Sequence, residues 1–364
     1  MTIQRRSVVK TVGLAAAAAA IAGPAIAQSA PEVKWRLTSS FPKSLDTIYG
    51  GADLFSRAIS EATDGKFQVQ VFAGGEIVPG LQAFDAVQNG TVEMCHTSMQ
   101  YYWGKDPTFG MFTALPFGPN TRQNNAWLYH GGGAELMAEF FNPYGITCLP
   151  GGNSGCQMGG WFRKEIKTIA DLDGLKLRIA GVAGKVLQKV GVVPQQIAGG
   201  DIYPALEKGT IDAAEWIGPY DDEKLGFNKV APYYYYPGWW EGGTTLQFAM
   251  SIAKFDELPK AYQSIVRSAA AMVNNDMLAK YDARNPVALK RLVGSGTKLQ
   301  AFTPDIMATC YKAAMELYAE FSATNDKFKK VYDAMTAFRN EEYLWFQLGE
   351  FSYDNFMIRQ RAKG

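Results

Sequence analysis

Two stretches far apart in the chain repeat one local pattern, and this repeat limits the folds that the sequence can adopt. Residues 86–93 read AVQNGTVE and residues 205–212 read ALEKGTID. Each predicts a helix end, a turn at glycine and the start of a strand, because glycine adopts the left-handed conformation that stops a helix and β-branched residues favour the strand that follows. The repeat therefore predicts two domains built on similar α/β plans.

The region around the first copy alternates between strand and helix patterns. Residues 34–39 predict a strand, and a helix pattern follows that Ser44 can cap and Gly65 can end. Apolar and polar side chains then alternate from Phe67 to Val71, which predicts a strand with one buried face. Because such segments continue to alternate along the chain, we expect the α/β fold class.

The repeat also indicates where a functional site would lie. In open α/β sheets, ligands bind beyond the carboxyl ends of the strands. The strands that follow the two copies end at His96–Ser98 and at Glu215–Trp216. A cleft between the two domains would bring both ends together, so we expect the site there.

The first 27 residues have the features of an export signal. Their only charged residues are the basic ones in the run QRRSVVK at residues 4–10. An apolar stretch follows that is too short to span a bilayer, and Ala25–Ala27 forms a small-x-small cleavage site. We therefore expect a twin-arginine signal at residues 1–27, a mature chain that starts near Gln28, and a periplasmic location. An ordinary secretory signal with two chance arginines is the alternative.

Composition excludes several classes of protein. Removal of the signal lowers the formal net charge from +1 to −2, which argues against nucleic-acid binding. The chain has 2 histidines and no HExxH motif, so zinc binding is not expected. One disulfide is possible in an oxidising compartment, but we interpret the cysteines, which show no CxxC spacing, as small buried residues. They are Cys95, Cys148, Cys156 and Cys310.

Three short motifs resemble catalytic or metal-binding patterns without completing them. Gly181–Lys185 lacks the spacing and the hydroxyl residue of a phosphate-binding loop. Asp171–Gly174 lacks the later acid of a calcium loop. Gly152–Gly155 is no nucleophile elbow, and neither histidine is a plausible partner for its serine. We therefore do not expect an enzyme.

Polar and aromatic residues that suit ligand binding remain. Gln157 and Trp161 follow a glycine-rich stretch, and Arg178 closes a strand pattern. Glu215 follows another strand, and Glu241 ends an aromatic run. Each also has a structural interpretation, because an arginine at a strand end is often a solvated surface charge and aromatic runs are often core.

Longer stretches are distinctive enough to indicate a family. They are WRLTSSFPK at 35–43, YWGKDP at 102–107, QMGGWF at 157–162, VPQQIAGG at 193–200, EWIGPY at 215–220 and PGWWE at 237–241. On these stretches, residues 34–357 resemble the substrate-binding subunits of tripartite ATP-independent periplasmic (TRAP) transporters. The similarity is closest to the branch that binds 2-oxo acids (α-keto acids).

The resemblance implies a two-domain, periplasmic-binding-protein-like fold of the type II-like plan, in which two α/β domains close on the ligand. Domain I is expected at residues 28–152 and about 242–302. Domain II is expected at residues 153–241 and about 303–327, with a long helix that spans both domains. Residues 328–364 would form a C-terminal helical segment for dimerisation.

The C-terminal segment has a further reason to contact a partner. Thr303 can cap a helix there, and beyond Asn325 aromatic residues fall on more than one helical face. One face can pack on the parent domain, and the surplus predicts a partner surface. The resemblance implies that the partner is a second copy of the chain. A wholly buried terminal helix is the alternative.

The resemblance also assigns the ligand contacts. Arg178 matches the arginine that clamps the ligand carboxylate, and its planar guanidinium suits two carboxylate oxygens. The other expected contacts with the substrate are Gln157, Asn153, Trp216, Tyr101 and Tyr102. Of the two tyrosines, Tyr102 is favoured for a phenolic hydrogen bond.

The same branch binds a metal ion with its substrate, at positions that match Gln157, Glu215, the Trp216 carbonyl and Glu241. These groups offer hard oxygen ligands, which exclude zinc and copper and favour a hard cation. Charge supports this expectation, because two carboxylates, an anionic ligand and one arginine sum to about −2, and an uncompensated buried charge is costly. Neither sodium nor calcium is selected by this sum, and the resemblance favours sodium.

These features predict a periplasmic solute-binding protein that binds a 2-oxo monocarboxylate, pyruvate or a longer relative, with a metal cation. It would deliver the ligand to the membrane permease of a TRAP transporter and would form a homodimer. A receptor for another carboxylate, such as lactate with calcium, is the nearest alternative. An exported enzyme and a receptor that reports to a sensor kinase are alternatives from other classes.

Overall fold

The structure, a computed structural model, describes residues 31–362, in which the strands form two sheets, A and B. The expected export signal and its cleavage site lie outside these residues. Within them, no helix combines the length and the apolar composition that a membrane crossing requires.

Sheet A carries the first strands of the chain and one late strand. It consists of β1 (Val33–Ser39), β2 (Phe67–Phe72), β3 (Met94–Thr97), β4 (Ile146–Asn153) and β10 (Thr245–Ser251), in the order β2-β1-β3-β10-β4. β1 pairs parallel with β2 and β3, and β10 pairs antiparallel with β3 and β4. As the alternation predicted, Phe67 and Val69 are buried while Gln68 and Gln70 are exposed.

Sheet B is built from shorter strands. It consists of β5 (Trp161–Phe162), β6 (Lys176–Arg178), β7 (Val193–Gln195), β8 (Ala213–Ala214), β9 (Tyr233–Tyr236) and β11 (Lys298–Ala301), in the order β11-β9-β5-β8-β6-β7. β6 pairs parallel with β7 and β8, whereas β5 runs antiparallel to β8 and β9. The α/β class is therefore confirmed.

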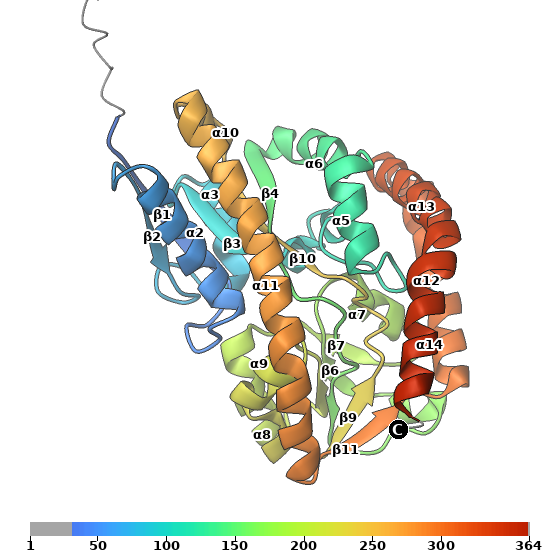
Figure 1. The fold of residues 1–364 in the computed structure, drawn as a ribbon. Helices are drawn as coiled ribbons and strands as arrows, with labels where there is room; N and C mark the ends of the chain where they lie inside the picture. Colours follow the sequence, from blue (N-terminus) through green and yellow to red (C-terminus); the bar gives the residue numbers. More distant parts are fainter. Residues whose placement is uncertain (1–30, 363–364) are drawn as a thin grey trace, which may run out of the picture. The chain divides into compact units, whose positions relative to one another are not determined.

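Helices cover the sheets and connect them (Figure 1). They are α2 (Ile48–Ala62), α3 (Ala83–Gln88), α4 (Thr108–Met111), α5 (Thr121–His130), α6 (Gly133–Phe141), α7 (Gly181–Gln188), α8 (Ile202–Glu207), α9 (Pro219–Leu225), α10 (Ile252–Asp256), α11 (Lys260–Gly294), α12 (Pro304–Thr324), α13 (Asp326–Phe346) and α14 (Ser352–Arg361). α2 packs on β2, α6 on β4 and α7 on β7.

The repeated sequence pattern forms the same turn in both halves. The glycines that follow α3 and α8, Gly90 and Gly209, have φ values of 70° and 72°. After α3, the amide of Thr91 donates to the carbonyl of Ala86 over 2.8 Å, and the matching bond after α8 measures 2.9 Å. Each turn leads the chain into a strand, β3 or β8, so the predicted repeat of local structure is confirmed.

The first helix starts later than the sequence predicted. Thr47, not Ser44, precedes α2, and its side chain makes no capping hydrogen bond. Ser44 lies instead in a turn in which the Leu45 amide donates to the Pro42 carbonyl over 3.1 Å. The predicted stop is confirmed, because Gly65 has a φ of 74° after the end of α2.

α11 is the helix that spans both sheets. It is 35 residues long and packs against β4 and α2 on the sheet A side and against α9 on the sheet B side (Figure 1). β11, which follows α11, belongs to sheet B. The division into domains stays a prediction. The chain passes from sheet A to sheet B along α11.

The four cysteines are free thiols in the structure. Cys95, Cys148 and Cys310 are buried, as interpreted from the sequence, whereas Cys156 is exposed. Cys95 and Cys148 lie on β3 and β4, and both pair with Ala249 of the strand between them. β10 therefore separates these two thiols.

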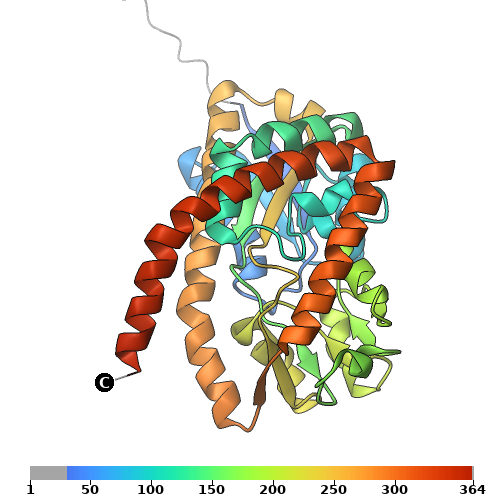
Figure 2. The same cartoon turned by 90° about the vertical axis from the view of Figure 1, so that its right-hand side faces the viewer.

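The end of the chain forms a helical arm of α12, α13, a π-helical turn at Gln347–Phe351, and α14. α13 packs against α4, α5 and α6 and buries Phe328 and Val331. Beyond this contact large apolar side chains are exposed, including Trp345 at 65% and Leu348 at 77%. Figure 2 shows α14 extending beyond the helices that α13 covers. A wholly buried terminal helix is therefore excluded for α14.

We predict that two glycines of this fold respond in opposite ways to alanine. Gly90→Ala places a side chain on left-handed backbone and should lower the free energy of unfolding by about 1–2 kcal/mol, although its Cβ would meet open space. Gly50→Ala, inside α2 and also in open space, should raise it by up to about 1 kcal/mol. Urea unfolding of the ligand-free protein measures both. Equal effects would contradict the turn assigned to Gly90.

Candidate functional site

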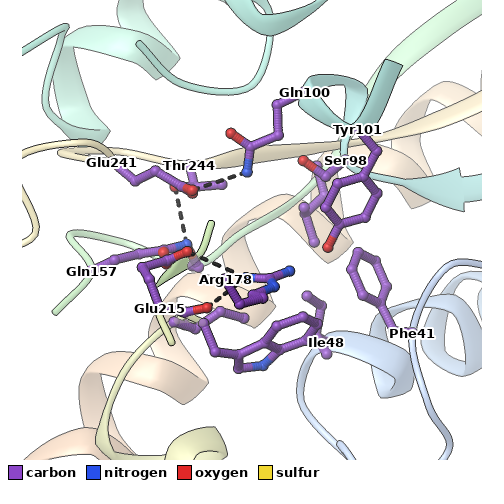
Figure 3. Close-up of a pocket in the computed structure, with 14 residues that line it drawn as sticks. Phe41, Ile48, Ser98, Gln100, Tyr101, Gln157, Arg178, Glu215, Glu241 and Thr244 are labelled. Carbon is purple, nitrogen blue, oxygen red and sulfur yellow. Dashed lines mark hydrogen bonds and ion pairs between the residues drawn. The ribbon is translucent and has the colours of Figure 1, made fainter. Parts of the chain in front are cut away.

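A cavity lies where the carboxyl ends of β3 and β8 come together (Figure 3). Its empty volume, with its open mouth included, is about 330 Å³. Ser98 follows β3, Glu215 and Trp216 follow β8, and Arg178 ends β6; all four line the cavity. The expectation that both strand ends meet at one site is confirmed.

Two segments that connect the sheets supply further polar groups. Gln157 lies between β4 and β5, and Glu241 lies between β9 and β10. The amide of Gln157 donates to the carbonyl of Glu241 over 3.1 Å, so the two connections run side by side at this point. Both side chains therefore reach the cavity from the connections and not from strands.

The Arg178 side chain is held by backbone carbonyls on one side, and the end of its guanidinium faces the cavity. Its side chain is 2% exposed, and Nε donates to the carbonyl of Ile197 over 3.1 Å. Nη1 donates to the carbonyl of Glu215 over 2.5 Å, and the guanidinium lies over the Trp216 ring at 5.0 Å. Figure 3 shows the end of the guanidinium pointing into the cavity, toward Tyr101. This arrangement leaves a planar, charged donor for an anion.

Two buried carboxylates share the cavity with this arginine. Glu215 and Glu241 are 1% and 2% exposed. Glu241 accepts hydrogen bonds from Gln100 Nε2 over 2.9 Å and from the Thr244 hydroxyl over 2.6 Å. Glu215 Oε2 lies 3.4 Å from Arg178 Nη1. Among the described residues that line the cavity, Arg178 is the one cation, so the site carries an excess of negative charge.

The pKa values of both acids are raised, mainly because the two carboxyls are buried. Burial, and then repulsion from Glu241, raise the pKa of Glu215 well above its ordinary value, and Arg178 only partly opposes the shift. Burial also raises the pKa of Glu241, against its hydrogen bonds and Arg178. Each carboxylate would be stabilised by positive charge placed beside it.

Free oxygen atoms mark where that positive charge would sit. Glu215 Oε1 and Gln157 Oε1 are buried and have no hydrogen-bond partner among the described residues. Gln157 Nε2 donates to the hydroxyls of Ser154 and Thr244 over 2.9 and 3.2 Å, which turns its oxygen away from them. Hard oxygen atoms of this kind fit sodium or calcium. A cluster of three His, Cys, Asp or Glu side chains is absent from the described residues, so amide and backbone oxygens would complete the set.

Asp222 holds the segment that carries Glu215 in place. Its buried carboxylate accepts from the Trp161 indole over 3.0 Å, the Tyr234 hydroxyl over 2.7 Å and the Ile217 amide over 3.3 Å. Trp161, singled out in the sequence, stacks on Tyr234 at 4.0 Å and is fully buried. It therefore supports the site from the core of sheet B and does not line the cavity.

Two expected contact residues lie outside the cavity lining. The Tyr102 hydroxyl accepts from the Phe84 amide over 2.9 Å and lies 3.1 Å from the Thr97 hydroxyl, so it faces the core. Asn153 accepts from the Gly155 amide over 2.8 Å and holds the start of a connection. Tyr101 does line the cavity, and burial raises its pKa to about 12, which keeps its hydroxyl protonated. The sequence-based preference for Tyr102 over Tyr101 therefore does not fit the structure.

Several lining residues were missed from the sequence. Gln100 and Thr244 position Glu241, and Phe41, Ile48 and Leu246 form an apolar wall. Gln100 lies in a 3-10 turn (Met99–Tyr102) directly after β3, so the strand-end rule could have found it. The apolar residues carry no signal, because such side chains are equally suited to the core.

Known proteins share this sequence pattern and this fold. The sequence model of the bacterial extracellular solute-binding proteins, family 7, matches residues 38–325. The chain is 45% identical to a monocarboxylate 2-oxoacid-binding periplasmic protein of Nostoc sp. over 360 residues, which cover 97% of this chain and 99% of the relative.

Two solved structures are similar over most of their length. One is a TRAP transporter solute-binding protein of Bordetella bronchiseptica, with a TM-score of 0.90 and 51% identity, and the match covers 92% of this chain and 99% of that one. That structure is a mixed-occupancy dimer, in which one active site holds copurified calcium and picolinate and the other is an apo site. A TRAP periplasmic solute-binding protein of Pseudoalteromonas atlantica, with bound sodium and pyruvate, has a TM-score of 0.87 and 37% identity, with 89% and 99% covered.

We predict that the two neighbouring tyrosines have separable roles. Tyr101→Phe should weaken the binding of a 2-oxo acid by about two- to tenfold, through the loss of one hydrogen bond in the cavity. Tyr102→Phe should leave affinity unchanged but lower the free energy of unfolding by about 1–3 kcal/mol, because the buried Phe84 amide loses its acceptor. Titration calorimetry and urea unfolding measure the two effects. The reverse pattern would restore the assignment made from the sequence.

Proposed function

The chain belongs to family 7 of the bacterial extracellular solute-binding proteins, and from this premise we propose that it binds a 2-oxo monocarboxylate, such as pyruvate, together with a metal cation. The ligand occupies the cavity between the carboxyl ends of β3 and β8. The protein then delivers it to the membrane permease of a TRAP transporter.

The charge balance of the cavity carries this proposal. Arg178 holds the ligand carboxylate, while Gln157, Glu215, the Trp216 carbonyl and Glu241 hold the cation. Without a cation, an incoming anion would meet two buried carboxylates at short range in a medium of low dielectric. When bound, the cation supplies positive charge to both glutamates and offers a chelate to the carboxylate and 2-oxo oxygens of the ligand.

Two relatives support this combination of ligand and cation. One holds sodium with pyruvate, and the other holds calcium with picolinate. Picolinate, like a 2-oxo acid, carries a second donor atom next to its carboxylate, so both ligands can chelate one ion. Plain fatty acids lack this second donor, and we propose that they bind more weakly for that reason. We favour sodium as the cation, with calcium as the alternative.

The periplasm is the compartment in which this function takes place. The twin-arginine pattern at residues 4–10 and the cleavage site at Ala25–Ala27 support export with removal of the signal.

A homodimer forms through the C-terminal arm in this proposal. From Tyr343 onwards the arm exposes apolar side chains, and Leu344, Trp345, Leu348 and Phe351 are each more than half exposed. An exposed apolar surface of this kind favours contact with another protein surface. The dimer of the Bordetella bronchiseptica relative supports a second copy of this chain as the occupant.

Removal of the cation should weaken pyruvate binding by about five- to 150-fold, the usual range of coupling between two sites. Pyruvate is titrated calorimetrically into protein dialysed with chelator into sodium-free buffer, with sodium, calcium or neither restored. Pyruvate should raise the affinity for the cation by the same factor, since linkage is reciprocal.

Glu241→Gln should lower the affinity for the cation with little change in the free energy of unfolding. Propionate should bind far more weakly than pyruvate.

The same titration has a predicted pH dependence. Because burial and the charge of Glu241 raise the pKa of Glu215, this carboxyl holds a proton at low pH that cation binding must release. Affinity for the cation, and with it affinity for pyruvate, should therefore fall as the pH drops.

In the cation titration, equal pyruvate affinity with sodium, with calcium and with neither would show that the cation has no part in binding.

The dimer is tested by sedimentation at micromolar concentration. Leu348→Glu combined with Phe351→Glu places charges on the exposed apolar arm and should convert the dimer to a monomer without a change in unfolding. Val287→Glu, at an exposed position of α11 away from the arm, is the matched control and should remain dimeric. A wild-type protein that sediments as a monomer would refute the dimer.

A further inference from the structure

A network of charged side chains joins the sheet A side of the protein to the sheet B side, outside the cavity. Asp46 lies in the loop between β1 and α2 of the sheet A side. Its carboxylate contacts Tyr220 and Lys224 of α9, which follows β8 of sheet B, and Arg284 of α11. One carboxylate thus accepts hydrogen bonds from donors on two other elements.

The side chains of this network lie within contact distance of one another. The Tyr220 hydroxyl lies 3.1 Å from each carboxylate oxygen of Asp46, and Arg284 Nη1 lies 3.2 Å from one of them. Lys224 forms an ion pair with the same carboxylate. Both cations also lie over the Tyr220 ring, at 4.6 Å for Lys224 and 4.9 Å for Arg284. Two positive charges are therefore gathered on one aromatic ring with Asp46 as their counter-charge.

The network is attached to both walls of the cavity without lining it. Phe41 and Ile48, on either side of Asp46 in the chain, line the cavity on the sheet A side. Tyr220 lies in the first turn of α9, shortly after Trp216, which lines the cavity on the sheet B side. The rings of Phe41 and Trp216 are 6.5 Å apart. The segments that Asp46 joins are thus the segments that carry these facing walls.

We propose that Asp46 is a positioning residue that holds the segment 41–48 against α9 and thereby slows the release of the bound ligand. This inference rests on the proposed function, because it concerns the ligand of that same cavity. Departure of a ligand between the two walls requires them to separate, and separation breaks the contacts of Asp46 with Tyr220 and Lys224.

A second surface ion pair offers a matched control. Arg36 of β1 forms an ion pair with Glu93 over 2.8 Å. Glu93 directly precedes β3, so both partners lie on the sheet A side. Separation of the two cavity walls leaves this pair intact. Glu93→Gln therefore removes a comparable exposed ion pair without touching the contact between the two sides.

The test compares the dissociation rate of pyruvate, with the cation present, in wild type, Asp46→Asn and Glu93→Gln by stopped-flow fluorescence. Asp46→Asn should release pyruvate about three- to tenfold faster, the effect of losing several partly exposed charged contacts. Added choline chloride should speed release from wild type more than from Asp46→Asn, because salt screens exposed charges. An unchanged rate in Asp46→Asn, or an equal increase in Glu93→Gln, would overturn the inference.

Hydrogen exchange of the ligand-free protein separates this inference from the proposed function. Amides of residues 41–48 should exchange faster in Asp46→Asn than in wild type, and Glu93→Gln should leave them unchanged. If wild type binds no 2-oxo acid, the proposed function fails, and the exchange result alone decides the role of Asp46. Unchanged exchange in Asp46→Asn would then refute it.

Discussion

The burial of two carboxylates, Glu215 and Glu241, in one cavity is the constraint on which the site depends. Burial raises the pKa of both carboxyls, and the charge of Glu241 raises that of Glu215 further, while Arg178 compensates only in part. The empty site is unfavourable, because a buried charge without a compensating partner costs several kcal/mol. In the proposed function a cation and an anion enter together, which would relieve the repulsion and favour an acid that can chelate the cation.

The fold places this charge where two sides of the protein can enclose it. Short strands of sheet B deliver Arg178 and Glu215 at neighbouring carboxyl ends, since Arg178 pairs with Ala214. The connections between the sheets bring Gln157 beside Glu241. α11 packs on both sides, and Asp46 joins them at the surface near the cavity. The polar groups of the site therefore come from segments on both sides of the cavity, and these segments would be held together when the two sides close on a ligand.

Sequence patterns predicted the parts of this arrangement that depend on local rules. Glycine in the turns after α3 and α8, the buried face of β2 and the strand-end position of Arg178 and Glu215 all follow from local conformational preferences. The orientation of Tyr101 and Tyr102 does not, because two neighbours in a 3-10 turn point to different sides and only packing against Phe84 decides which faces the core. Asn153 and the apolar wall were unpredictable for the same reason. The resemblance to a family assigned the metal-binding role to Gln157 and Glu241, whose proximity arises from two connections far apart in sequence.

The most direct measurement of the central claim is a crystal structure of the protein grown with pyruvate and refined to a resolution that identifies ions by their ligand distances. The account predicts an ion in contact with Glu215 Oε1, Gln157 Oε1 and Glu241, together with a pyruvate carboxylate on Arg178. Pyruvate bound on Arg178 with no ion beside it, and Glu215 hydrogen-bonded directly to the ligand as a protonated acid, would contradict the account.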